Sequence, residues 1–185
     1  MVLTYSKQVP LGDPAPEFTL PEPLTGLNHS LTGCSGSSGT LVMFICNHCP
    51  FVIHIRDELV RIAKDYMDAG IGMVAINSND VINYPADSPA KMAEHASKYA
   101  YPFPYLFDES QEVALAYHAV CTPDFFLFDA TLKLVYRGQL DESTPGNNQP
   151  VTGQALRSAM DALILGHPIP SKQNPSMGCN IKWKK

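Results

Sequence analysis

The sequence predicts an α/β fold in which helices flank a mixed central sheet. Residues 40–45 and 71–76 form two continuous apolar segments with β-branched side chains, as is typical of strands buried on both faces. Residues 50–69 lie between them and carry apolar side chains at helical spacing, which predicts an amphipathic helix ended by Gly70. A strand, a helix and a second strand in this order form a parallel pair joined by a crossover.

The other expected elements extend this pair at both ends of the chain. In order, they are an edge hairpin of residues 18–20 and 27–31, a flexible Gly/Ser loop at 33–40, a helix over 89–99 capped by Ser88, a short strand or turn at 105–107, a helix over 110–119 capped by Asp108 or Ser110, a hairpin of 125–128 and 132–136, and a last helix over 152–165. The second hairpin makes the expected sheet mixed.

We expect a single domain over residues 1–185. It consists of an N-terminal β extension over residues 1–39, a core over residues 40–166 and a C-terminal tail over residues 167–185 that lies along the body.

Composition argues against several classes of partner. The net charge is −5, and the one basic cluster, residues 182–185, is short, so no nucleic-acid partner is expected. No segment approaches the roughly 20 apolar residues of a membrane span, so no membrane partner is expected. The first residues lack the apolar core of a signal peptide, and we therefore expect a cytoplasmic protein.

Two of the five cysteines form a pair suited to redox chemistry. Cys46 and Cys49 are separated by two residues at the junction between the predicted strand and helix, so their sulfurs can reach bonding distance. The first helical turn offers unpaired N–H groups and a positive dipole end, which favour a thiolate. His48 lies between the thiols, and its imidazolium is expected to stabilise the thiolate and make the couple more oxidising.

Further motifs accompany this C-x-x-C-P sequence. Residues 120–127 (VCTPDFFL) place Thr122 and Pro123 before an apolar strand, and residues 11–20 read LGDPAPEFTL. With the cysteine pair, these motifs resemble the thioredoxin superfamily, and the second one resembles the opening of its peroxiredoxin-like branch. The tail PSMGCNIKW, residues 175–183, is similar to that of a bacterial group in this branch often labelled thiol-disulfide isomerase/thioredoxin.

The resemblance covers nearly the whole chain and implies a thioredoxin fold. It implies a cis Thr122–Pro123 bond whose backbone faces the two cysteines and pairs with an incoming polypeptide as an added strand. By the thioredoxin pattern, Cys46 is the exposed attacking thiol and Cys49 the buried resolving thiol. With Pro50 as the first helical residue, Cys49 instead lies at the helix tip, in the peroxiredoxin-like placement. The sequence leaves both assignments open.

The function that these residues predict is thiol–disulfide exchange between the Cys46/Cys49 pair and disulfides of proteins or small molecules. No cofactor is expected beyond a reducing system such as thioredoxin or glutathione. Cys121 and Cys179 are candidate auxiliary thiols. Thioredoxins carry a buried acid in the strand before the pair; this strand has none, so proton transfer is expected through water or His48.

Three alternatives remain at this point. A thiol peroxidase is one, although the threonine that activates peroxiredoxin cysteines is replaced by Cys46 or Met43, depending on the register. A copper carrier and a redox sensor are the others. No metal site is expected, because zinc needs four ligands and no second cysteine pair is present, and because copper carriers of this fold use C-x-x-x-C-P. The other histidines are interpreted as surface or satisfied core residues: His29, His54, His95, His118 and His167.

Overall fold

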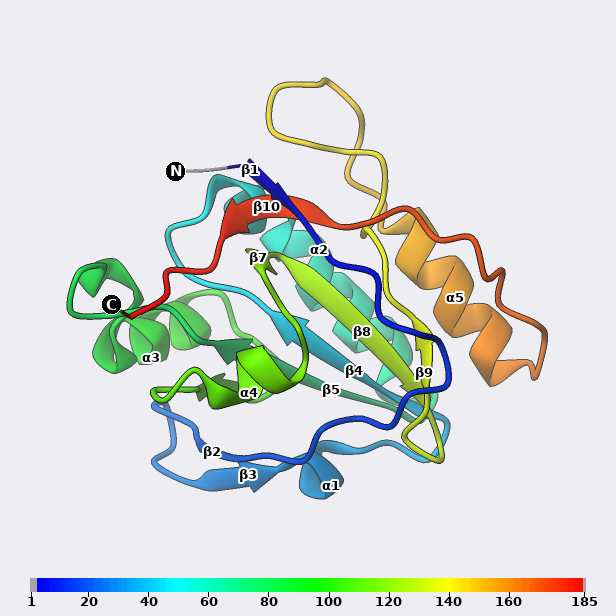
Figure 1. Ribbon diagram of the computed structural model, residues 1–185, viewed down its shortest axis with the longest axis horizontal. Helices are drawn as coiled ribbons and strands as arrows, with labels where there is room; N and C mark the ends of the chain where they lie inside the picture. Colours follow the sequence, from blue (N-terminus) through cyan, green and yellow to red (C-terminus); the bar gives the residue numbers. More distant parts are fainter. Residues whose placement is uncertain (1–2, 185) are drawn as a thin grey trace.

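A five-stranded mixed sheet forms the centre of the computed structural model, which describes residues 3–184 (Figure 1). Its strand order is β6-β5-β4-β8-β9. The bounds in that order are Tyr105–Phe107, Ile71–Asn77, Gly39–Phe44, Asp124–Asp129 and Leu134–Tyr136. β4 runs parallel to β5 and antiparallel to β8, so the predicted mixed sheet is confirmed.

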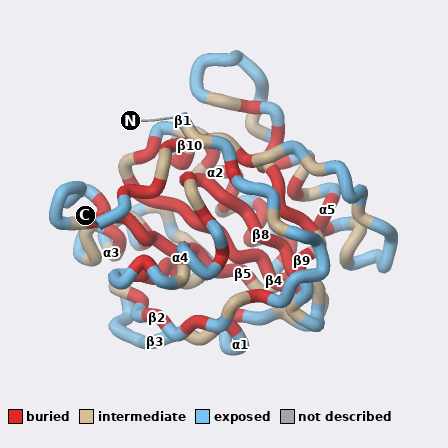
Figure 2. Tube along the Cα trace, in the orientation of Figure 1, coloured by how far each residue is buried: buried red, intermediate tan, exposed pale blue. Residues whose placement is uncertain are grey.

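Burial on both faces explains the continuous apolar sequence of the central strands. Val42 of β4 lies beside Val74 of β5 and Phe126 of β8, and every residue of β4 is buried (Figure 2). Successive side chains of a strand point to opposite faces. They therefore contribute alternately to two apolar cores, one on each face of the sheet.

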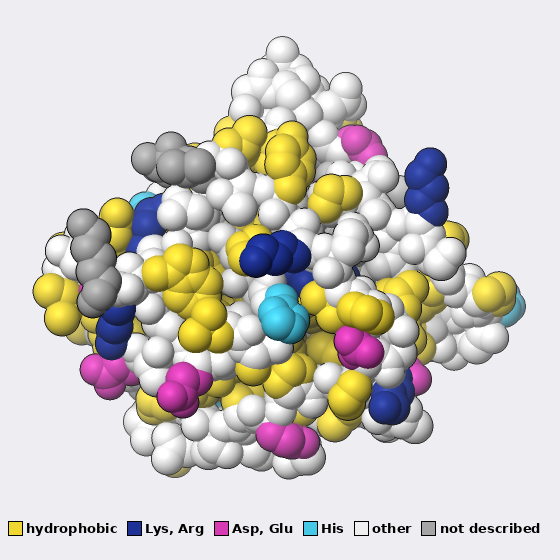
Figure 3. All heavy atoms as spheres, in the orientation of Figure 1, with side chains coloured by type: hydrophobic (Ala, Val, Ile, Leu, Met, Phe, Trp, Pro, Cys, Tyr) yellow, Lys and Arg dark blue, Asp and Glu magenta, His cyan; other side chains and the backbone are white. Residues whose placement is uncertain are grey.

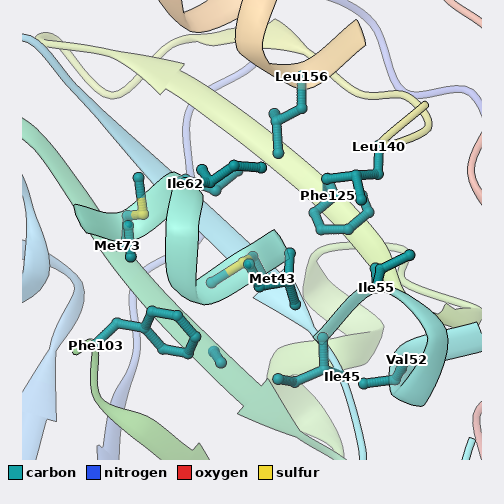
Figure 4. Close-up of a cluster of buried hydrophobic side chains, with 14 of the residues drawn as sticks. Met43, Ile45, Val52, Ile55, Ile62, Met73, Phe103, Phe125, Leu140 and Leu156 are labelled. Carbon is teal, nitrogen blue, oxygen red and sulfur yellow. The ribbon is translucent and has the colours of Figure 1, made fainter. Parts of the chain in front are cut away.

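The first core lies between the sheet and three helices: α2 (Pro50–Tyr66), α3 (Pro89–Lys98) and α5 (Gln154–Ile164). α2 is the crossover from β4 to β5. Figure 4 shows Val52, Ile55 and Ile62 of α2 gathered with Met43 of β4 and Phe125 of β8. The helical spacing read from the sequence is confirmed, and the observed helix ends within three residues of the predicted end.

The second core is covered by smaller elements: the hairpin of β2 (Thr19–Pro21) and β3 (Asn28–Ser30), α1 (Leu31–Cys34) and α4 (Glu112–Ala116). The hairpin is confirmed. The flexible loop predicted from residue 33 is wrong in its first residues, because α1 forms there. The Ser30 side chain accepts a 3.0 Å hydrogen bond from the Gly33 N–H, and Leu31 is fully buried.

α4 is shorter than the helix predicted over residues 110–119. It ends at Ala116, and His118 already has a left-handed backbone, with φ of 53°. The N-cap residue of this helix is Gln111, so the predicted cap at Asp108 or Ser110 is wrong, although both side chains accept hydrogen bonds from N–H groups of the helix. Oδ2 of Asp108 accepts from the Ala114 N–H at 3.0 Å, and Oγ of Ser110 accepts from the Glu112 N–H at 3.2 Å.

A separate three-stranded sheet joins the two ends of the described chain. β1 (Leu3–Tyr5), β10 (Met177–Asn180) and β7 (Cys121–Thr122) pair in the order β1-β10-β7, and both pairings are antiparallel. Figure 1 shows β10 in red next to β1 in blue. The tail was expected only to lie along the body, and strands this short carry too few residues for a periodic pattern.

Two observations bear on the partners expected from composition: the spread of basic side chains on one face, and the character of the helices. In Figure 3 the Lys and Arg side chains are scattered over the face and do not gather in a large patch. Among the helices of residues 3–184, none combines the length and apolar character required to cross a bilayer.

Candidate active site

Cys46 and Cys49 follow the carboxyl end of β4, and Cys49 is the N-cap residue of α2. Pro50 occupies the first helical position, where its missing N–H leaves no hydrogen bond unmade. Both cysteines are buried, with 1% of Cys46 and 0% of Cys49 exposed. The thioredoxin pattern implies an exposed Cys46, and that expectation is wrong, because other parts of the chain cover the pair.

Thr122 contacts both cysteines. The Thr122–Pro123 bond is cis, as the sequence predicts. Oγ1 of Thr122 lies 3.4 Å from Sγ of Cys46, and its carbonyl oxygen lies 3.1 Å from Sγ of Cys49. The fold thus brings together two motifs that are more than 70 residues apart in the sequence.

Cys179 of β10 adds a third thiol at this site. Its Sγ lies 2.7 Å from Sγ of Cys49. In the β10–β7 pairing, Cys179 is the partner of Thr122. The resemblance to thioredoxins implies that an incoming polypeptide pairs with this backbone. In the described structure the protein's own tail is paired there, and pairing with an incoming polypeptide stays a prediction.

The two cysteines of the pair differ in their readiness to ionise. A hydrogen bond from the Cys46 thiol makes the largest contribution to lowering the pKa of Cys49 to about 5. Burial opposes this shift, while the Cys179 thiol and the N–H groups of Val52 and Cys179 add to it. The same contact, together with burial, raises the pKa of Cys46 well above its usual range. At neutral pH, Cys49 is therefore the thiolate, and Cys46 is the thiol that donates to it.

The carbonyl of Thr122 limits this ionisation. It accepts a hydrogen bond from the Cys49 thiol at 3.1 Å and repels the thiolate, so it favours the protonated form. The S–H donors of Cys46 and Cys179 and the N–H donors of Val52 and Cys179 each favour the charged form, and the net pKa of Cys49 is lowered.

The contact between the two thiols predicts a specific pH dependence of alkylation. In the wild type, the rate constant for iodoacetamide at Cys49 should rise about tenfold per pH unit and level off near pH 5, because the thiolate is the nucleophile. Cys46→Ala removes the largest contribution and should move the midpoint upward, toward the ordinary value near 8.5. Cys46→Ser keeps an O–H donor and should move it less. A midpoint that stays near 5 in Cys46→Ala would contradict this account.

The side chain of His48 is hydrogen-bonded to Asp87, and a ring nitrogen lies within 4.8 Å of the Cys46 sulfur. Nδ1 of His48 lies 2.6 Å from Oδ2 of Asp87, and this hydrogen bond raises the pKa of His48 against the opposing effect of burial. The ring also stacks on Tyr84, with 5.8 Å between centroids. The role of His48 in stabilising the thiolate stays a prediction, because Cys46 and Cys179 supply the nearest donors to Cys49.

Asp87 organises the loop between the cysteines, and the sequence analysis missed it. It is the last residue of a short 3-10 helix, Pro85–Asp87, and is 0% exposed. Its Oδ1 accepts from the backbone N–H groups of Asn47 (2.8 Å) and His48 (3.3 Å), and its Oδ2 accepts from His48 and from Asn79 at 2.7 Å. Asp87 follows His48 by 39 residues and Asn47 by 40, so no local sequence motif indicates that they are in contact.

The hydrogen bonds to Asp87 also bear on metal binding. Cys46, His48 and Asp87 offer ligand atoms within 4.8 Å of one another, the one trio of this kind in the described part of the chain. Both oxygens of Asp87 already accept two hydrogen bonds each. A cation would have to displace those contacts, so the arrangement fits a structural anchor better than a metal centre.

Comparisons with known proteins agree with this geometry. The Redoxin family matches residues 10–156, which is most of the chain. The chain belongs to the Redoxin family. A search of curated proteins finds no match. Among solved structures, an uncharacterized conserved protein from Geobacillus kaustophilus is 55% identical, covers 100% of this chain and 97% of its own, and has a TM-score of 0.97.

Two other solved structures extend the comparison. A hypothetical protein from Sinorhizobium meliloti 1021 is 46% identical, covers 98% of each chain and has a TM-score of 0.95. The thioredoxin domain of a thiol-disulfide oxidoreductase from Bacteroides vulgatus is 18% identical, covers 70% of this chain and 89% of its own, and has a TM-score of 0.59. The predicted thioredoxin fold and superfamily are thereby confirmed, and a thiol redox function follows for this Redoxin-family protein.

Cys121, the other candidate auxiliary thiol, is a packed residue of the Redoxin-family site. It is 0% exposed, and its Sγ lies 3.6 Å from the carbonyl oxygen of Pro123. Burial raises the pKa of its thiol far above the ordinary value. Cys34 lies in the core on the other face of the sheet, away from the cysteine pair. Of the three remaining cysteines, only Cys179 has its sulfur in contact with the pair in the described structure.

A cavity of about 250 Å³ lies beside the cis-proline. Its lining includes Phe51, His54 and Ile55 from the first turns of α2, Pro123, Leu140 and Met177. Nε2 of His54 is buried and has no hydrogen-bond partner among the described residues, so the prediction of a surface or satisfied core histidine is wrong for His54. The rest of the lining is largely polar and includes the carboxylates of Asp141 and Glu142, so the cavity has a mixed apolar and acidic wall.

Proposed function

We propose that this Redoxin-family protein is a thiol–disulfide oxidoreductase that exchanges its Cys46/Cys49 dithiol with disulfides of proteins or small molecules. The observation that carries the proposal is the unequal pair itself. Cys49, whose pKa is lowered to about 5, lies beside a protonated Cys46 and against the cis Thr122–Pro123 segment.

In the proposed reaction, Cys49 is the attacking thiolate. It bonds to one sulfur of the substrate disulfide and releases the other sulfur as a thiolate. Cys46 then attacks Sγ of Cys49 and passes its proton to the departing substrate sulfur, so that a Cys46–Cys49 disulfide forms. Two electrons have moved from the protein to the substrate, and a thioredoxin or glutathione system returns them.

The lowered pKa of Cys49 also bears on the direction of exchange. A group that stabilises the thiolate stabilises the reduced protein, which makes the couple a stronger oxidant. Because Cys49 is ionised at neutral pH, we place this couple on the more oxidising side of an unperturbed dithiol. Asp87 accepts hydrogen bonds from the backbone N–H and the ring of His48, and these bonds fix the loop that positions Cys46 and Cys49.

The proposal is tested by trapping and by turnover. Purified Cys46→Ser/Cys179→Ser protein, incubated with insulin or with oxidised glutathione, should accumulate a mixed disulfide on Cys49, because no thiol in contact with Cys49 remains to displace the substrate. Wild-type protein with dithiothreitol should accelerate insulin precipitation. If Cys46→Ser/Cys179→Ser traps nothing and the wild type does not reduce insulin, the oxidoreductase proposal fails.

A thiol peroxidase is the second candidate, and one observation favours it. Cys49 lies at the tip of α2 with a strongly lowered pKa, which is the peroxiredoxin-like placement named above. The two activities differ in the product at Cys49. With hydrogen peroxide, a peroxidase would form a sulfenic acid on Cys49 at micromolar oxidant, detectable with dimedone in Cys46→Ser. An oxidoreductase would react far faster with disulfides than with peroxide.

A further inference from the structure

The C-terminal strand β10 lies where a thioredoxin-like protein would bind its substrate. It pairs with β7, the strand that ends at the cis-proline, through Cys179↔Thr122 and Asn180↔Cys121. A substrate polypeptide that added to this edge would use the same backbone groups. The protein's own chain therefore occupies the expected docking edge in the described structure.

The close approach of β10 depends on a glycine. A Cβ added to Gly178 would lie 2.0 Å from the carbonyl oxygen of Thr122 and 3.0 Å from Cδ of Pro123. No side chain fits at that distance, so Gly178 lets the two backbones meet. Hydrogen bonds on both sides hold the strand in place: Oγ of Ser176 donates to the Pro123 carbonyl at 2.7 Å, and the Ile181 N–H donates to the Val120 carbonyl at 3.0 Å.

This placement brings the Cys179 sulfur to the position of a substrate sulfur. Sγ of Cys179 lies 2.7 Å from Sγ of Cys49, and Cys179 is 2% exposed. Burial, together with its contact to Cys49, raises the pKa of the Cys179 thiol to about 12, so it is protonated while Cys49 is the thiolate. Cys49 thus has a thiol of its own loop on one side and a thiol of β10 on the other.

We propose that β10 is a built-in substrate strand and that Cys179 is a third redox thiol, which forms a disulfide with Cys49. The inference rests on the proposed function, which supplies the oxidised Cys49. From a Cys46–Cys49 disulfide, Cys179 attacks Sγ of Cys49 and its proton passes to the departing Cys46 sulfur. One S–S bond forms as another breaks, and no electrons are gained or lost. From a mixed disulfide of Cys49 with a substrate, the same attack releases the substrate thiol.

The Cys49–Cys179 disulfide fastens β10 to the tip of α2. Oxidised protein would then keep its docking edge closed until a reductant breaks this bond. A substrate polypeptide must displace β10 before it can pair with β7, so β10 and the substrate compete for one edge and one sulfur.

The test uses the full chain carrying Cys46→Ala, which removes the competing resolving thiol. The protein is treated with oxidised glutathione, quenched with acid and digested with trypsin without reduction. Glutathione first adds to Cys49 and releases reduced glutathione; Cys179 then displaces the second glutathione. We expect a link between tryptic peptides 8–56 and 173–182, with Cys49 and Cys179 assigned by fragmentation, and little glutathione retained.

Two matched variants in the Cys46→Ala background sharpen the test. Cys179→Ser should leave glutathione on Cys49. Gly178→Ala should move β10 off the edge and lower the ratio of linked to glutathionylated protein by about tenfold or more, because its methyl group meets the Thr122 carbonyl. Cys34→Ser and Gly33→Ala, on the other face of the sheet, are controls that should change neither product.

Two results would overturn the inference, and they differ. Stable glutathione on Cys49 with a free Cys179 in the Cys46→Ala protein would refute the third redox thiol and leave the proposed function standing. Absence of any glutathione or link on Cys49, in folded Cys46→Ala and in Cys46→Ala/Cys179→Ser alike, would refute the proposed function and the inference together.

Discussion

Cys49→Ser is expected to lower insulin reduction and disulfide exchange by about 10³-fold or more, because the serine hydroxyl is not ionised near neutral pH and cannot form the mixed disulfide. The fold should be retained, since serine differs from cysteine by one atom and Cys49 occupies an N-cap position, which serine favours. The measurement is the steady-state rate of glutathione-linked disulfide reduction, with circular dichroism as the check on folding.

The matched variant for this experiment is Cys46→Ser, which keeps the attacking sulfur. It should still form the mixed disulfide in a single turnover, because the attacking sulfur of Cys49 is present and only the release of substrate by Cys46 is lost. Equal single-turnover rates for wild type and Cys49→Ser would show that the attacking sulfur is Cys46. That outcome would restore the assignment that the thioredoxin pattern implies.

Asp87→Ala is expected to destabilise the protein by about 3–5 kcal/mol. The substitution removes an acceptor of four hydrogen bonds and leaves buried N–H groups of Asn47 and Asn79 without their partner. Burial by itself raises the pKa of Asp87, and the hydrogen bonds from His48 and Asn79 outweigh it, so the net pKa is lowered. The change should appear as a lower urea midpoint at pH 7.

The control for Asp87→Ala is Asp87→Asn, which keeps one acceptor oxygen for the backbone and removes the charge. It should cost less stability than Asp87→Ala. In both variants the pKa of His48, followed by proton NMR, should fall, because the bond to Asp87 is the main cause of its elevation. A histidine whose pKa is raised on folding adds to the free energy of unfolding, fully so below its unfolded pKa. The contribution of His48 should therefore be lost as the pH rises through its folded pKa. An unchanged His48 titration would contradict this pairing.

The sequence was sufficient to predict those parts of the structure that depend on local patterns. Apolar periodicity predicted β4, α2 and β5, and the C-x-x-C-P and Thr122–Pro123 motifs predicted two of the three segments that meet at the site. The third segment was not predicted as a strand. β10 contains four residues around a glycine, and what makes it a strand is the backbone of β7 and β1 on either side.

The electrostatics of the site could not be predicted for a related reason. His48 was assigned to the thiolate because it is adjacent in sequence, yet its nearest charged partner is Asp87, 39 residues away. The sequence also left the attacking thiol open between Cys46, which the thioredoxin pattern favours, and Cys49. Their pKa values differ mainly because of the hydrogen bond from the Cys46 thiol to Cys49, with further contributions from Cys179 and the N–H of Val52, and these contacts become visible only when the tail and the helix tip are placed in space.

The burial of both redox sulfurs has a kinetic consequence. Since Cys46 and Cys49 are almost fully shielded, a reagent in solution reaches them only during a local opening of the structure, so an observed rate is the product of an opening equilibrium and an intrinsic reactivity. The opening equilibrium is the same for all slow substrates, so their observed rates differ only through their intrinsic reactivities. For a substrate that reacts faster than the structure recloses, turnover reaches the opening rate and rises no further. The shielding thus sets one upper limit on turnover that all fast substrates share.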